Sequence, residues 1–180
     1  MTQLSLPTKI IRLHRALDKA QLPHAFGGAL ALAWCTQRAR GTIDIDVNIF
    51  VTTDRVSQAL AALPRSVQVG GNDRSRLEQD GQTRLWWGPT PVDVFLNTTE
   101  FHERVAERAR VESFAGAAVP FLSCSDLAVF KAFFNRTKDW ADLEEMAAAG
   151  SLDLDRVVGV LARLLGPADE RIVRLLTLMP

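Results

Sequence analysis

The stretch GTIDIDVNIF, residues 41–50, alternates apolar and polar side chains as a β-strand does. One face of this strand would carry four branched apolar side chains, those of Ile43, Ile45, Val47 and Ile49. Asp44 and Asp46 share the opposite face, where residues two apart lie roughly 6–7 Å from each other. A buried strand gains no stability from two adjacent carboxylates, whereas carboxylate oxygens are preferred ligands of hard cations. The pair therefore predicts a metal site.

Composition limits the classes of protein to which the chain can belong. Its 180 residues, of which 47% are hydrophobic and 23% charged, are enough for one ordinary globular core. Twenty-one basic residues balance twenty-one acidic ones, so any contact with RNA would depend on a local patch. Cys35 and Cys124 lie far apart in apolar segments and are expected to be free thiols. No signal sequence or membrane-spanning stretch is recognisable, so we expect a cytoplasmic protein.

Hydrophobic spacing and turn residues predict a mixed α/β (α+β) fold, a small mixed sheet flanked by helices. Strands are expected over residues 24–26, 41–50, 66–69, 92–96 and 111–119, with a hairpin over 75–87 that turns at Asp80 and Gly81. Helices are expected over residues 8–21, 29–36, 55–62, 100–110, 123–135, 138–149, 155–165 and 168–178. A boundary near Pro120 would divide a core, residues 1–120, from a C-terminal helical segment, residues 121–180, packed on it as one unit.

A third aspartate stands in a similar setting, in the segment PVDVFL, residues 91–96. Val92, Val94 and Leu96 would line one face of this strand and Asp93 the other. If the strand pairs beside that of Asp44 and Asp46, three carboxylates converge on one patch that could hold two Mg²⁺ ions, with Mn²⁺ as an alternative. Such a site suits phosphoryl or nucleotidyl transfer from an NTP.

Four residues near the aspartates are candidates for binding phosphate. Gly27 and Gly28 lie between a predicted strand and a predicted helix, where glycines let backbone N–H groups approach a phosphate closely. The same glycines would equally permit close packing of the helix. Arg40 and Thr42 add a cation and a hydroxyl just before the aspartates.

Lys131 is the only charged residue in the apolar segment LAVFKAFF, residues 127–134, and is therefore expected to be buried. It needs an anionic partner, and a nucleotide phosphate would serve, unless its amine reaches solvent. Asp139 follows on the next helix and could orient Lys131, although aspartate is also common at helix N-termini. Asp142 is expected on the surface.

Two further features have structural explanations. Asp153 and Asp155 form a second D-x-D pair, but they open a helix, where capping accounts for them. Trp86 and Trp87 alternate along their strand, so one is expected to be buried. The exposed one would belong to an interface or stack on a base.

The ordered set of these segments resembles the polymerase-β-like nucleotidyltransferase superfamily. The matching segments are HAFGGALALAWCTQRARGTIDIDVNIFV, PVDVFL and PFLSCSDLAVFKAFFNRTKDWADLEEM, which together span residues 24–146. The likeness is greatest to the small bacterial branch of AbiE-type and MenT-type toxins. Many members have Gly-Ser where this chain has Gly27-Gly28, so a hydroxyl that would hold the triphosphate is missing.

The resemblance implies a nucleotidyltransferase fold and metal-dependent transfer of a nucleotide from an NTP. It implies metal ligation by Asp44, Asp46 and Asp93, a phosphate contact by Lys131, and an active-site role for Asp139. It also implies an RNA acceptor, most plausibly tRNA, and a toxin neutralised by an antitoxin. Three alternatives are an aminoglycoside or lincosamide nucleotidyltransferase, an antitoxin that nucleotidylates its toxin, and an inactive fold that serves as a binding module.

Overall fold

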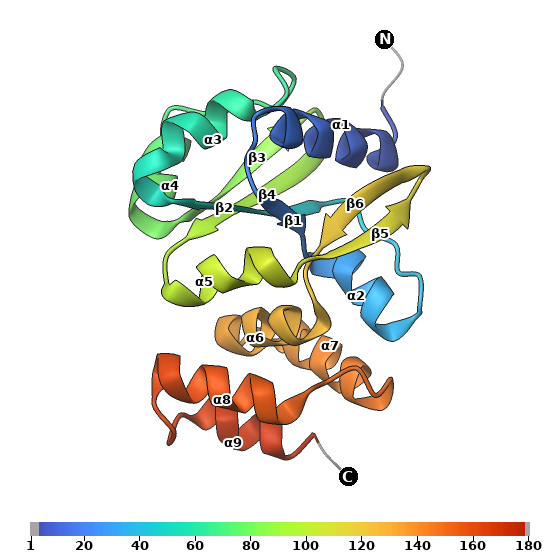
Figure 1. Ribbon diagram of the computed structural model, residues 1–180, viewed down its shortest axis with the longest axis vertical. Helices are drawn as coiled ribbons and strands as arrows, with labels where there is room; N and C mark the ends of the chain where they lie inside the picture. Colours follow the sequence, from blue (N-terminus) through green and yellow to red (C-terminus); the bar gives the residue numbers. More distant parts are fainter. Residues whose placement is uncertain (1–3, 179–180) are drawn as a thin grey trace. The chain divides into compact units, whose positions relative to one another are not determined.

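Six strands pair in the order β3-β4-β2-β1-β6-β5 (Figure 1). They are His24–Phe26 (β1), Ile45–Thr52 (β2), Gln82–Trp87 (β3), Thr90–Asn97 (β4), Arg110–Phe114 (β5) and Ala117–Phe121 (β6). The pairs β2–β4 and β1–β6 are parallel and the other three are antiparallel. The predicted mixed sheet with flanking helices is therefore confirmed.

The computed structural model describes residues 4–178, which divide into two compact units. The first consists of Met1–Gly27 and Gly41–Phe121 and contains the whole sheet. The second consists of Gly28–Arg40 and Leu122–Pro180. The second unit thus includes one segment, Gly28–Arg40, that precedes Pro120 by many residues in the sequence. Within residues 4–178, no helix combines the length and the apolar character needed to cross a membrane.

The first unit packs helices against both faces of its sheet. They are Leu6–Lys19 (α1), Val56–Ala62 (α3), Asp73–Asp80 (α4) and Glu100–Val105 (α5), with short 3₁₀ turns at Thr53–Arg55 and Ala106–Arg108. Figure 1 shows α1 and α3 on one side of the sheet and α5 on the other. The core contains Ile45, Val47 and Ile49, which are fully buried as their alternation predicts. Ile43 lies just before β2 and is 78% exposed, so its predicted place on the buried face is wrong.

The second unit is entirely helical in its regular structure. Its helices are Gly28–Thr36 (α2), Cys124–Phe134 (α6), Thr137–Ala148 (α7), Leu154–Leu165 (α8) and Glu170–Leu176 (α9). Helix α6 lies at the centre of this unit and contacts α2, α7, α8 and α9. Three polar side chains cap helices of this unit: Ser123 caps α6, Asp153 caps α8 and Asp169 caps α9. The capping explanation of Asp153 is thereby confirmed.

Cys35 and Cys124 form a disulfide that joins α2 to α6, with their Cα atoms 5.5 Å apart. The prediction of two free thiols is wrong. The separation of 89 residues hid the pairing, because only the packing of α2 on α6 brings these two apolar segments together.

The predicted hairpin over residues 75–87 is also wrong. Residues 73–80 form helix α4 instead, and Gly81 ends it with a φ of +67°. A glycine after a helix supplies the left-handed conformation that a C-terminal cap requires, and here a Cβ would lie 2.2 Å from Thr98 Cγ2. The actual hairpin joins β3 to β4, with Trp87 paired to Thr90 across a two-residue turn. Asp-Gly therefore marks a helix end here.

Three further boundaries differ from those predicted. The strand expected over residues 66–69 is reduced to one bridge, between Gln68 and Trp86. The helix expected over residues 100–110 ends at Val105 and continues only as a 3₁₀ turn. The strand expected over residues 111–119 is the hairpin β5–β6, in which Ala115 and Gly116 both have positive φ.

Candidate active site

A row of charged side chains crosses three neighbouring strands of the first unit. Asp46 of β2 pairs directly with Asp93 of β4, and Asp93 pairs directly with Arg84 of β3. Residues paired in this way project from the same face of a sheet. Asp44 lies two positions before Asp46, immediately before β2 begins. We call the three aspartates, Asp44, Asp46 and Asp93, the carboxylate row, and Arg84 is its basic partner. The predicted pairing of the two aspartate strands is confirmed.

Arg84 binds Asp93 through both prongs of its guanidinium. Its Nε donates to Oδ1 and its Nη2 to Oδ2, each at 2.7 Å. The hydrogen bonds to Asp93 are the largest cause of a raised pKa for Arg84, and the negative charges of Asp93, Asp44 and Asp46 raise it further. The three carboxylates thus act together on one positive charge. The negative potential that these carboxylates produce is a property that a cation-binding site requires.

The side chains of the row are turned toward protein partners. Asp93 is bound by Arg84, and the hydroxyl of Thr42 donates to Asp44 Oδ1. With these orientations, no three His, Cys, Asp or Glu side chains within residues 4–178 are gathered into a group able to hold a metal ion. The positions and the oxygen chemistry of Asp44, Asp46 and Asp93 nevertheless fit a divalent cation.

Gly27 and Gly28 occupy the turn between β1 and α2. The N–H of Gly27 donates to the backbone oxygen of Asp46 at 2.9 Å, so it is engaged within the sheet. Gly28 begins α2 with a φ of +54°, a conformation that favours glycine. Their predicted contact with phosphate stays a prediction. Thr42 donates to Asp44, and its predicted contact with the triphosphate also stays a prediction.

In the second unit, Lys131 of α6 is buried, as predicted, with 8% of its side chain exposed. Its Nζ donates to Asp142 Oδ2 at 2.5 Å and lies 3.9 Å from Asp139 Oδ1. Asp139 is itself 1% exposed and accepts hydrogen bonds from the Arg136 guanidinium at 2.6 and 3.1 Å. The anionic partners of Lys131 are therefore carboxylates of α7. Its predicted contact with a nucleotide phosphate stays a prediction.

Asp142 was predicted on the surface and is buried instead, with 6% exposure. It binds Lys131 through one oxygen and Arg40 through the other. Arg40, predicted to contact phosphate, is thus held by this carboxylate. The sequence did contain a signal, because Asp142 follows Asp139 by three residues and so lies on the same face of the helix. We call these residues, Lys131, Asp139, Asp142, Arg40 and Arg136, the lysine cluster.

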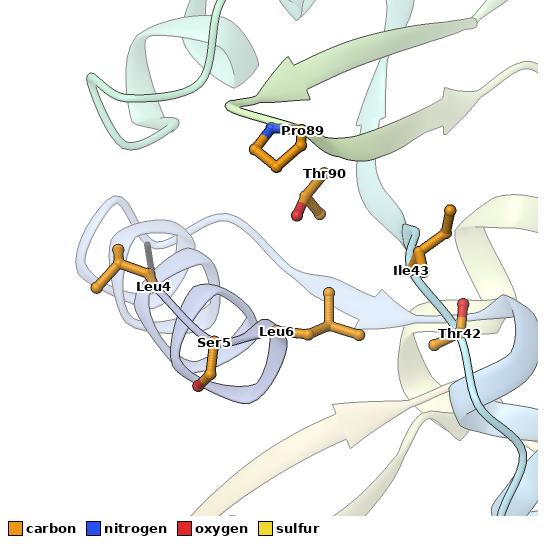
Figure 2. A pocket seen from close by; sticks show the side chains of 7 residues that line it. All are labelled: Leu4, Ser5, Leu6, Thr42, Ile43, Pro89 and Thr90. Carbon is orange, nitrogen blue, oxygen red and sulfur yellow. The ribbon is translucent and has the colours of Figure 1, made fainter. Parts of the chain in front are cut away.

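A shallow pocket lies in the first unit beside the segment that leads into β2 (Figure 2). Its volume is about 470 Å³, and it is lined by Leu4, Ser5, Leu6, Thr42, Ile43, Pro89 and Thr90. Thr42 connects the pocket to the carboxylate row through Asp44. Thr90 connects it to Lys9, a buried lysine whose Nζ donates to Thr90 Oγ1 at 2.7 Å and to the Trp87 oxygen at 2.8 Å. The lining residues themselves carry apolar and hydroxyl groups but no charge.

Comparison with solved structures finds the same fold in nucleotidyltransferases. The antibiotic-resistance factor ANT(2″)-Ia, solved in solution, is 15% identical, with a TM-score of 0.60 and 88% of this chain and 90% of that chain covered. Its crystal structure with adenylyl-2″-tobramycin is 18% identical, with a TM-score of 0.59 and coverages of 87% and 95%. An antigenic nucleotidyltransferase-like protein from Paracoccidioides brasiliensis is 16% identical, with a TM-score of 0.56 and coverages of 97% and 93%. At these identities the likeness establishes the fold.

No curated protein matches the chain. A family model described as "Nucleotidyltransferase of unknown function (DUF6036)" matches residues 9–174. This match includes both the carboxylate row and the lysine cluster. The chain belongs to this nucleotidyltransferase family.

Proposed function

We propose that this nucleotidyltransferase moves a nucleoside monophosphate from an NTP to a hydroxyl of RNA, most plausibly tRNA. We further propose that it acts as the toxin of a toxin–antitoxin pair. The observation that carries the chemistry is the carboxylate row, in which Asp46 and Asp93 are directly paired and Asp44 adds a third charge. Nucleotidyltransferases in general use NTPs with divalent cations.

In the proposed reaction, Asp44, Asp46 and Asp93 would hold divalent cations, and Asp93 would also face the acceptor. When bound, the cations would neutralise charge on the triphosphate and activate the acceptor oxygen. The acceptor hydroxyl loses its proton to Asp93 as its oxygen bonds to the α-phosphorus. The bond from that phosphorus to the bridging oxygen of the β-phosphate breaks, and pyrophosphate leaves.

The exposed Trp86 supports an RNA acceptor. Its side chain is 45% exposed, whereas Trp87 is 5% exposed, which confirms that the two alternate between surface and core. Along β3, Arg84 and Trp86 are both on the exposed face. Trp86 is therefore about 6–7 Å along the strand from Arg84, at the end of the carboxylate row. An exposed indole beside a phosphoryl-transfer site provides a surface on which a nucleobase can stack.

A second candidate acceptor is an aminoglycoside, because the fold is shared with ANT(2″)-Ia. A cationic aminoglycoside would be expected to bind in an acidic pocket. The pocket in Figure 2 has hydroxyl and apolar walls and supplies no acidic side chain. The same pocket supplies no basic side chain for RNA, so its lining favours neither acceptor, and the labelling experiment decides between them.

The proposal is tested by incubating the purified protein with each α-³²P-labelled NTP and Mg²⁺, together with either total bacterial RNA or tobramycin. We expect label to appear in an RNA band of tRNA size. Label on tobramycin alone would replace the RNA proposal with the antibiotic one. Absence of label from both acceptors would contradict the first proposal and the second.

Replacing Trp86 with alanine is expected to raise the RNA concentration that gives half-maximal labelling about tenfold, because stacking on an aromatic side chain contributes about 1–3 kcal/mol per base. Val111→Ala is the matched control, since Val111 is 67% exposed on β5 at the other edge of the same sheet. Equal RNA dependence in the two variants would show that Trp86 does not contact the acceptor.

A further inference from the structure

Arg84 and Asp93 form an ion pair at the position where the proposed reaction requires a metal ligand. Arg84 lies on β3, the last strand of the sheet on this side, and uses both oxygens of Asp93. Its side chain is 50% exposed, while that of Asp93 is 17% exposed. The guanidinium of Arg84 therefore occupies the carboxylate of Asp93, which a divalent cation would bind.

We propose that Arg84 is a nucleotide-binding residue that stays on Asp93 until a divalent cation takes its place. This inference rests on the proposed function. In the free protein, Arg84 neutralises part of the charge of the carboxylate row. Binding of a divalent cation by Asp93 releases the guanidinium, which then binds the triphosphate. Cation binding and NTP binding are thereby coupled through one side chain.

Three properties of Arg84 make such an exchange feasible. The guanidinium is 50% exposed, so a divalent cation can reach the pair from solvent, and the two hydrogen bonds to Asp93 set the free energy that this cation must exceed. The released side chain already projects from the face that carries Asp46 and Asp93, because all three are paired across the strands. A guanidinium also presents a planar fork of donors that matches phosphate oxygens as well as it matches a carboxylate.

The exchange predicts opposite effects of one substitution on two ligands. Arg84→Gln should bind Mn²⁺ about tenfold more tightly than the unmodified protein, because no guanidinium competes for Asp93 and a charged two-pronged contact no longer has to be broken. The same variant, saturated with Mn²⁺, should bind the four NTPs about tenfold less tightly, because a charged two-pronged contact with phosphate is lost. Mn²⁺ binding would be followed by electron paramagnetic resonance, and NTP binding by calorimetry with α,β-methylene analogues that cannot react.

Two further variants make the test specific. Arg76→Gln is the control, since Arg76 is an exposed arginine of α4 and its loss should change neither affinity. Arg84→Lys keeps the charge without the fork, so it should give intermediate NTP affinity, and it remains informative if the glutamine variant does not fold. Loss of both affinities together, or no change in either, would overturn the inference by making Arg84 only a structural partner of Asp93. If the unmodified protein binds Mn²⁺ but none of the NTP analogues, the proposed function itself fails, and this inference with it.

Discussion

Replacing Asp46 with asparagine is expected to lower the rate of nucleotidyl transfer by roughly 10³-fold. The substitution keeps the size of the side chain but removes one negative charge from the centre of the carboxylate row, where Asp46 pairs directly with Asp93. A loss of about 4 kcal/mol of electrostatic stabilisation in the transition state corresponds to a rate effect of this size. The measurement is the initial rate of label transfer at saturating NTP.

The chain contains a matched control for this experiment. Asp153 also begins a D-x-D pair, but it caps α8 by accepting a hydrogen bond from the backbone N–H of Arg156. Asparagine caps helices as well as aspartate does, so Asp153→Asn should retain full activity and full stability. Equal rates for the Asp46 and Asp153 variants would contradict the assignment of the carboxylate row as the reaction site.

Replacing Asp142 with alanine is expected to lower the free energy of unfolding by roughly 3–5 kcal/mol, the cost of leaving a buried charge without its partner. Lys131 is 8% exposed and its hydrogen bond to Asp142 is the shorter of its two carboxylate contacts, at 2.5 Å against 3.9 Å for Asp139. Asp139 cannot fully replace the lost partner, because Arg136 binds both of its oxygens. The measurement is urea denaturation followed by circular dichroism.

Two variants distinguish the effect of an unpaired buried charge on stability from a general disturbance of helix α7. Glu144→Ala changes an exposed residue of the same helix and should alter stability by less than about 0.5 kcal/mol. The double variant Lys131→Met with Asp142→Leu removes both charges and should recover most of the lost stability, because an apolar pair can replace a buried ion pair. A double variant as unstable as Asp142→Ala would show that the charges of the lysine cluster are not the cause.

Much of the fold followed from local patterns. The alternation of residues 45–49 correctly predicted a strand with one buried face, and helical spacing correctly predicted α1 and the four C-terminal helices. The errors occurred where one local signal has two meanings. Asp80-Gly81 suits both a hairpin turn and a helix end, and the structure shows that it ends helix α4.

The sequence by itself determined which residues carry charge in apolar surroundings: Asp44, Asp46, Asp93 and Lys131. It could do so because a charged residue within an otherwise apolar segment is recognisable from its immediate neighbours in the sequence. Only the tertiary structure decided which groups meet those charges. Arg84 reaches Asp93 through strand register, Asp142 reaches Lys131 through the packing of α7 on α6, and Cys35 reaches Cys124 through the packing of α2 on α6. The two cysteines are 89 residues apart, and the other two contacts depend on strand register and helix packing, none of which a local pattern specifies.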